Sequence, residues 1–219
     1  MDNPNIEILY EDADTLVIDK PAGFLSEHAE GAPSVIDALV SHSACGFLAP
    51  ITRLDREVSG VMLLAKNKKS AAFYTAEMAD KTLFRKEYLA VIEGRMETPS
   101  GELRDLLFKD SGKNKSYVVK RPRRGVKEAV LSYEVLGERE VEGCALSLVR
   151  VLLHTGRTHQ IRVQFSSRRH PLVGDRRYGG RVGYPMGLLS FRLSLRLSTG
   201  REAVFTLSDA KREPFSAFL

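Results

Sequence analysis

Residues 52–66 read TRLDREVSGVMLLAK. One carboxylate, Asp55, stands between Arg53 and Arg56, and an uninterrupted apolar run follows at residues 61–65. Such a run is typical of a strand covered on both faces, so the acid would lie at the mouth of a buried strand. A carboxylate kept ionised and partly desolvated there is a candidate nucleophile or base. The alternative is a surface aspartate that pairs locally with one of the arginines.

The length and composition of the chain are those of a soluble globular protein. Its 219 residues are 43% hydrophobic and 28% charged, and this length allows one large domain or two small ones with a proper core. No apolar run approaches the roughly 20 residues that span a bilayer, and the polar N-terminus lacks the order of a secretory signal. Cys45 and Cys144 match no metal spacing and would stay reduced in the cytoplasm. We therefore expect a single cytoplasmic domain over residues 1–219, monomeric and without a membrane segment.

The basic residues are concentrated in two stretches. The net charge is only +5, but residues 104–127 hold nine lysines and arginines against two acids, and residues 150–192 hold nine arginines against one acid. This distribution suits a polyanion such as nucleic acid, because binding releases counterions from the phosphates. The alternative is a solvated basic face with no partner. Residues 107–126 also contain glycines and a proline, so we expect a basic loop or hairpin that faces RNA.

Short apolar, β-branched or alternating runs predict many strands and few helices. The strand patterns lie at residues 6–10, 15–19, 61–65, 84–92, 129–136, 144–153, 188–197 and 202–207. The first two are close enough for a hairpin. Since strands and helices do not alternate regularly, we expect an α+β fold with a largely antiparallel, mixed sheet and a few flanking helices.

Three helices and one turn are expected from local signals. Ser34 would be the N-cap of a helix over residues 34–40, and Thr158 would be the N-cap of a helix that ends near residue 167. The chain is expected to turn at residues 59–60. A further helix over residues 68–81 would bury an apolar stripe formed by Ala72, Phe73, Ala76 and Ala79.

Metal and nucleotide sites find little support in the sequence. Among the five histidines only His154 and His159 are near each other, and their spacing is not the four residues that place two ligands on one helix face. Neither GxxxxGK[ST] nor GxGxxG occurs. We therefore expect no metal, no nucleotide and no other cofactor.

Five stretches of the chain, taken in order, resemble the successive motifs of the RluA-type RNA pseudouridine synthases. They occur in the order of the family, and the resemblance spans roughly residues 6–197. They are DKPAG at 19–23, RLDREVSG at 53–60, KEYLAVIEG at 86–94, TGRTHQIR at 155–162 and HPLVGD at 170–175. The resemblance implies a pseudouridine synthase catalytic domain, which isomerises uridines in structured ribosomal or transfer RNA. It also implies that the target base is flipped out of its stack.

The resemblance implies a role for each matching residue. Asp55 would be the nucleophile, and Arg162 would pair with it and keep it ionised. Tyr88 would stack on the flipped uracil and help to move a proton, while Arg53 would fill the space left by the nucleotide. These roles are implied by the family and do not follow from the spacing. Without the resemblance, Tyr88 would be interpreted as a core aromatic residue and Arg162 as a solvated charge.

RNA binding is assigned to two further groups of residues. Arg157, His159 and Gln160 would either contact the phosphate backbone or only order their loop. Tyr178 is expected to be structural. The remaining substrate-binding candidates are the basic residues of the segment 107–126, namely Lys120, Arg121, Arg123 and Arg124.

The sequence departs from the family pattern at two positions beside Asp55. Thr52 stands where the family usually has histidine, and Val58 where it usually has threonine. We also expect no small RNA-binding domain in front of the motifs, so that RNA recognition would rest on the catalytic domain. The departures leave open an alternative function, a catalytically impaired RNA-binding or assembly factor on the same fold.

Overall fold

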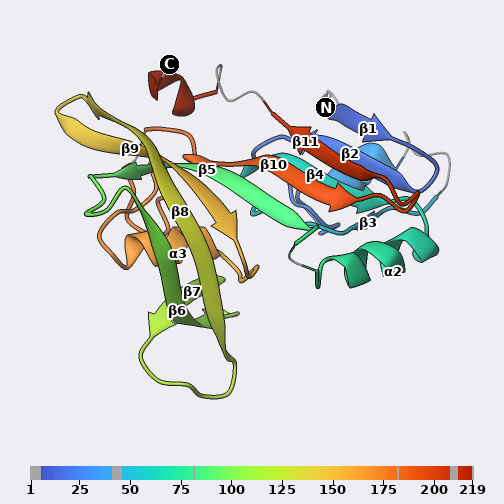
Figure 1. The fold of residues 1–219 in the computed structure, drawn as a ribbon, viewed down its shortest axis with the longest axis horizontal. Coiled ribbons are helices and arrows are strands. Elements are labelled where there is room, and N and C mark those ends of the chain that lie inside the picture. Colours follow the sequence, from blue (N-terminus) through green and yellow to red (C-terminus); the bar gives the residue numbers. More distant parts are fainter. Residues whose placement is uncertain (1–5, 41–45, 81, 182, 208–211, 219) are drawn as a thin grey trace. The chain divides into compact units, whose positions relative to one another are not determined.

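The computed structural model describes residues 6–40, 46–80, 82–181, 183–207 and 212–218. The chain divides into two compact units. The colours of Figure 1 follow the sequence, so the residue ranges of each unit can be found with its colour bar. The first unit comprises Met1–Lys86 and Leu189–Leu207, and the second comprises Glu87–Leu188 and Ser208–Leu219. One domain over the whole chain stays a prediction.

The first unit is built on a mixed sheet. Strands β1 (Glu7–Glu11) and β2 (Thr15–Lys20) form the expected antiparallel hairpin. β4 (Ser59–Ala65) pairs antiparallel with β2 and with the short β3 (Ala49–Pro50), and it pairs parallel with β10 (Leu188–Arg196). β11 (Glu202–Thr206) continues antiparallel from β10. The apolar run at 61–65 is buried at every position, as expected of a strand covered on both faces.

The two helices of the first unit begin at side-chain caps. α1 (Val35–Leu39) has Ser34 as its N-cap, and the Ser34 hydroxyl accepts a hydrogen bond from the amide of Asp37 at 3.1 Å. This confirms the expected cap. α2 (Lys68–Glu77) begins at Asn67, whose side chain accepts from the amide of Ser70 at 2.8 Å.

The expected apolar stripe of α2 is wrong. Ala72 and Ala76 are exposed, and the helix turns Ser70 and Tyr74 into the protein instead. The hydroxyl of the fully buried Tyr74 lies 2.6 Å from the hydroxyl of Thr15 on β2. An alanine offers little apolar area, so burial of one tyrosine ring with a hydrogen-bonded hydroxyl decides how the helix is rotated.

The second unit holds a sheet in the strand order β5-β9-β8-β6-β7. Its strands are β5 (Arg85–Glu93), β6 (Ser100–Asp110), β7 (Lys115–Val119), β8 (Val126–Val141) and β9 (Cys144–Leu153). The pairs β6–β7, β6–β8 and β8–β9 are antiparallel, and the long β8 runs beside β6 and β9 (Figure 1). The basic segment at 107–126 is therefore a hairpin, one of the two forms expected.

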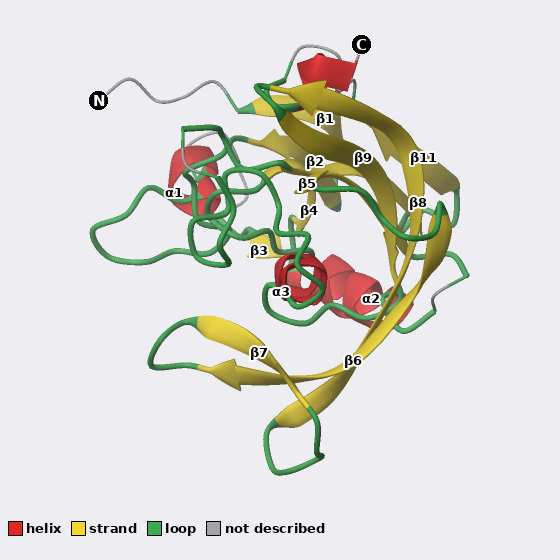
Figure 2. Cartoon of the chain, turned by 90° about the vertical axis from the view of Figure 1, so that its left-hand side faces the viewer, coloured by secondary structure: helices red, strands yellow, loops and turns green. Residues whose placement is uncertain are grey.

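The single α-helix described in the second unit, α3 (Gln160–Ser166), packs against the sheet (Figure 2). Val163 lies in a buried cluster with Leu107 of β6, Ala129 of β8 and Tyr178. The short 3-10 helix η1 (Phe215–Phe218) packs on β8.

The expected N-cap of α3 is wrong. The cap is His159, which has a left-handed backbone (φ 53°) and makes no side-chain cap bond. The first turn is held by Gln160 instead, whose Oε1 accepts from the Arg157 amide at 3.0 Å and from the Thr155 hydroxyl at 2.8 Å. A helix residue thus reaches back to the loop, which a search for Ser or Thr caps does not detect. No helix among the described residues has the length and apolarity to cross a membrane.

Candidate functional site

Asp55 lies in a short turn between β3 and β4. Its carbonyl accepts a hydrogen bond from the amide of Val58 at 3.0 Å. The Ser26 hydroxyl accepts from the amide of Leu54 at 3.0 Å and donates to the carbonyl of the same residue at 2.8 Å. The residue immediately before Asp55 is therefore fixed by a buried side chain from another loop.

The loop that follows β2 also holds the Asp55 turn. The amide of Gly23 donates to the carbonyl of Arg56 at 2.7 Å, and Arg56 Nε donates to the carbonyl of Gly23 at 3.0 Å. Gly23 has φ +89°, a conformation that side chains disfavour. The first two sequence motifs, DKPAG and RLDREVSG, are therefore in direct contact in the fold.

The two departures from the family pattern have structural roles in this turn. The Thr52 hydroxyl accepts from the amide of Leu63 at 2.9 Å, which ties the start of the turn to β4. Val58 is buried. Both residues hold the turn from inside.

The expected turn at residues 59–60 is wrong, since both residues belong to β4 and the chain turns at residues 56–57. Gly60 has a different purpose. A Cβ at this position would lie 2.2 Å from the carbonyl oxygen of Ser190, so β10 can approach β4 only if residue 60 is glycine.

Lys20 is a fully buried cation beneath the Asp55 turn. Its ammonium donates to the carbonyl oxygens of Pro21 at 2.9 Å, Phe24 at 2.7 Å and Arg56 at 3.3 Å. These three acceptors come from both loops that shape the turn. Lys20 was not predicted as a site residue, although a lysine between an apolar strand and a proline is a signal in the sequence.

The charge of Lys20 is opposed by burial and favoured by nearby acids. Burial lowers the pKa of Lys20 to about 8, while the negative charges of Asp55, Glu57 and Asp19 act in the opposite direction. The ammonium of Lys20 therefore interacts electrostatically with the carboxylate of Asp55.

The lowered pKa of Lys20 predicts a pH-dependent stability. The unfolded chain binds the proton more tightly than the folded protein, so the contribution of Lys20 to the free energy of unfolding is constant below about pH 8 and rises toward pH 10.5. We expect the wild type to gain about 2 kcal/mol over Lys20→Met between roughly pH 7 and pH 9.5. Urea unfolding of both proteins at each pH measures the difference. Parallel pH profiles would contradict the lowered pKa.

Two predicted catalytic residues, Tyr88 and Arg162, belong to the second unit. Tyr88 lies on β5 and is buried. Arg162 lies on α3 and forms a two-pronged ion pair with Asp175: Nε is 2.7 Å from Oδ2 and Nη2 is 2.9 Å from Oδ1. The pairing of Arg162 with Asp55 stays a prediction.

Asp175 was not predicted as a site residue. It is fully buried, and its Oδ1 also accepts from the amide of Tyr178 at 3.3 Å. Its loop is tight, since a Cβ at Gly180 would lie 1.9 Å from the carbonyl of Leu172. The signal was present, because Asp175 is the one acid among the arginines of residues 150–192.

The candidates around the start of α3 mostly face inward. Gln160 is buried and donates to the carbonyl of Val130 at 3.1 Å in addition to its bonds to the loop. His159 is also buried, with Nδ1 3.0 Å from the hydroxyl of Tyr178. Arg157 donates from Nε to the carbonyl of Glu128 at 2.8 Å. These contacts order the loop, and contact with RNA phosphate stays a prediction for all three.

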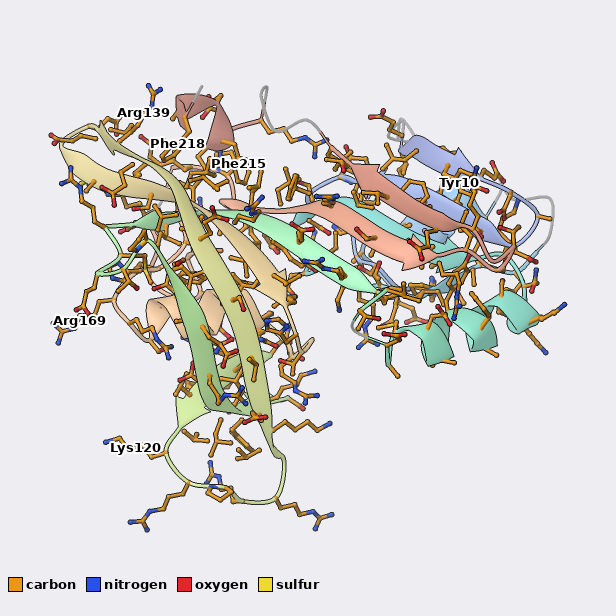
Figure 3. All side chains as sticks on the ribbon, in the orientation of Figure 1. Tyr10, Lys120, Arg139, Arg169, Phe215 and Phe218 are labelled. Carbon is orange, nitrogen blue, oxygen red and sulfur yellow. The ribbon has the colours of Figure 1, made fainter. Side chains whose placement is uncertain are left out.

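The other RNA-binding candidates are exposed. Arg53 lies 3.3 Å from Glu27 in a surface ion pair. The loop between β7 and β8 carries Lys120 outward from the ribbon (Figure 3). The guanidinium of Arg123 lies over the ring of Phe108 at 4.7 Å. Four exposed cations follow one another on this loop: Lys120, Arg121, Arg123 and Arg124.

Comparison with known proteins agrees with the motifs. The family model described as RNA pseudouridylate synthase matches residues 14–167. An uncharacterized RNA pseudouridine synthase of Aquifex aeolicus is 34% identical over 187 residues, 81% of this chain and 57% of the relative. Ribosomal large subunit pseudouridine synthase D of Vibrio parahaemolyticus is 35% identical over 188 residues, 83% of this chain and 55% of the relative. The chain thus spans little more than half the length of these relatives.

Solved structures with similar folds have related names. Human RNA pseudouridylate synthase domain containing 1 superposes with a TM-score of 0.80 at 23% identity, covering 99% of this chain and 89% of that one. Human RNA pseudouridylate synthase domain containing 4 gives 0.74 at 24% identity, covering 92% and 88%. These likenesses confirm the expected α+β fold. From the family match and the curated relatives together, the chain belongs to the RNA pseudouridylate synthase family, as its five RluA-type motifs predicted.

Proposed function

We propose that this protein isomerises specific uridines of structured ribosomal or transfer RNA to pseudouridine, as a cytoplasmic monomer without a cofactor. The bond between the ribose and the base nitrogen breaks, the base turns over, and a bond from the ribose to carbon 5 forms. The nitrogen gains a proton and carbon 5 loses one, so the reaction is balanced without an added reagent. The observation that carries the proposal is Asp55, held in a turn over the buried ammonium of Lys20 in a chain of this family.

Asp55 is the proposed nucleophile. A carboxylate attacks at neutral pH and is also a tolerable leaving group, so it can form and release a covalent intermediate. The attraction between Asp55 and Lys20 supports a negatively charged residue at this position. The bonds from Ser26 and Gly23 support a fixed direction of attack.

The remaining site residues complete the proposal. Arg162 pairs with Asp55 during the reaction, Tyr88 stacks on the flipped uracil, and Arg53 takes the place of the extruded nucleotide. The bidentate contact with Asp175 supports the role of Arg162, because it holds the guanidinium in one orientation.

The activity is tested by adding the protein to ribosomal and transfer RNA from cells that lack it, then locating pseudouridine by carbodiimide labelling and reverse transcription. One relative is named for the large ribosomal subunit, so its RNA is the first substrate to examine. We expect new pseudouridine at defined positions. Binding of RNA without any new pseudouridine would favour the assembly factor, and would overturn the proposed activity.

We further propose that the cations of the β7–β8 loop bind RNA phosphates. Their exposure and their succession on one short loop support this role. Replacing all four with glutamine should flatten the dependence of log K on log salt by about 3, because roughly one counterion is released per phosphate contact. Filter binding at several salt concentrations measures the slope. The four residues are Lys120, Arg121, Arg123 and Arg124.

A matched pair of double variants separates this loop from general charge. Arg123→Gln with Arg124→Gln removes two exposed cations of the loop, and Lys68→Gln with Lys69→Gln removes two exposed cations of α2. Only the first double variant should change the salt slope. Equal salt slopes for the two double variants would refute RNA binding by the loop.

A further inference from the structure

Tyr178 lies where the basic hairpin meets the loop that holds Arg162. Its side chain is buried. The hydroxyl accepts a hydrogen bond from the amide of Ser116 at 2.8 Å and lies 3.2 Å from the carbonyl of the same residue. It also lies 3.0 Å from Nδ1 of His159. One hydroxyl thus contacts both polar backbone groups of Ser116 and a buried imidazole.

The hydroxyl of Tyr178 takes the place of a neighbouring strand. β7 is the last strand in the order of its sheet, so the backbone groups that face away from β6 need another partner. At Ser116 that partner is Tyr178, and the Ser116 hydroxyl adds a bond to the carbonyl of Thr158 at 2.7 Å. The hydroxyl therefore fixes β7, the strand that leads directly into the basic loop.

The ring of Tyr178 lies beside two cations. The Nζ of Lys115, on β7, is 5.0 Å from the ring centroid. The guanidinium carbon of Arg162 lies 5.3 Å from the ring centroid, within the range of a cation–π interaction. The amide of Tyr178 donates to Asp175, the partner of the same guanidinium. Arg162 is therefore restrained by the carboxylate and by the ring together.

Other contacts also join the hairpin to this loop. Lys115 Nζ donates to the carbonyl of Arg177 at 2.7 Å, and Arg177 Nη1 donates to the carbonyl of Lys113 at 3.0 Å. These are surface contacts, and neither touches Arg162. Tyr178, in contrast, makes buried hydrogen bonds to the hairpin and also contacts Arg162 directly.

We infer that Tyr178 is a positioning residue with two separable parts. Its hydroxyl positions the basic hairpin for binding of RNA. Its ring, which also contacts Lys115 of the hairpin, positions Arg162 for the reaction. This inference rests on the proposed function, in which the β7–β8 loop binds RNA and Arg162 assists Asp55. The two parts are separable by substitution, because phenylalanine keeps the ring and leucine removes both.

The test compares steady-state kinetics of Tyr178→Phe and Tyr178→Leu on an RNA that the wild type modifies. Tyr178→Phe should raise KM about 5-fold and leave kcat within about 2-fold, because it loses only hydrogen bonds to the hairpin side. Tyr178→Leu should raise KM at least as much, because Lys115 also loses the ring, and should lower kcat about 10-fold, because Arg162 loses it. Tyr184→Phe is the control. It removes a tyrosine hydroxyl that donates to Glu142 at 2.8 Å, outside the hairpin, and should behave as the wild type.

A second measurement does not depend on activity or on the folding of the leucine variant. Hydrogen exchange of the Ser116 amide should accelerate about 10-fold in Tyr178→Phe and stay unchanged in Tyr184→Phe. If the wild type forms no pseudouridine, the proposed function fails. Accelerated exchange would still support the stabilisation of β7 by the hydroxyl of Tyr178. Unchanged exchange, or equal loss of kcat in both Tyr178 variants, would overturn the inference.

Discussion

Asp55→Asn is expected to form no detectable pseudouridine, with a rate below about a thousandth of the wild type, while its affinity for RNA is retained. An amide oxygen is a poor nucleophile, so the covalent step is lost. The substitution keeps the shape of the side chain, and the bonds that hold the turn involve Ser26, Leu54, Gly23 and Arg56. Single-turnover assays at saturating RNA measure the rate, and filter binding measures the affinity.

Glu57→Gln is the matched control for Asp55→Asn. Glu57 lies in the same turn, is exposed and also interacts with the charge of Lys20. If Asp55 acts as a nucleophile, the control should retain nearly full activity. Equal loss in both variants would assign Asp55 an electrostatic role only, and normal modification by Asp55→Asn would remove it from the mechanism.

Asp175→Asn is expected to lower the free energy of unfolding by about 3–5 kcal/mol, because it leaves the buried guanidinium of Arg162 without its carboxylate. The side chain of Asp175 is 0% exposed and that of Arg162 is 6% exposed, so water cannot replace the lost partner. Asparagine has nearly the same shape, so the loss reports charge and hydrogen bonding more than packing. Urea unfolding at neutral pH measures it.

Glu128→Gln provides the comparison for Asp175→Asn. Glu128 is the carboxylate of a pair with Arg104 in which both side chains are more than half exposed, at 54% and 56%. The free energy of unfolding of Glu128→Gln should match that of the wild type within measurement error, because exposed ion pairs are hydrated and screened. Similar effects of both substitutions would show that burial does not strengthen the Arg162–Asp175 pair.

Local sequence signals predicted much of the fold. The hairpin of β1 and β2 follows from two β-branched runs around a polar turn, and the start of α1 follows from Ser34, because both depend on near neighbours in the chain. The rotation of α2 could not be predicted in this way. It depends on the hydrogen bond of Tyr74 to Thr15, which lies 59 residues away in sequence.

In the candidate site, too, the features that depend on residues distant in sequence could not be predicted. The motifs indicated Asp55, Tyr88 and Arg162 through their resemblance to a family, but not the groups that hold them. Asp175 lies 13 residues beyond Arg162 and Tyr178 lies 62 residues beyond Ser116, and neither distance has a local signature. The prediction of Thr158 as a cap failed for a related reason. Gln160 satisfies the loop from within the helix, where a sequence rule expects the donor-rich end to be capped from outside.

The sequence by itself determined the family, the order of the motifs and the strands whose apolar runs demand burial, since these depend on residue type and spacing. Only the tertiary structure decided that Lys20 is buried beneath the Asp55 turn and that Asp175 is the fixed partner of Arg162. The physical reason is the cost of burying charge. A charge leaves water only where several partners converge on it, and here these partners come from distant parts of the chain.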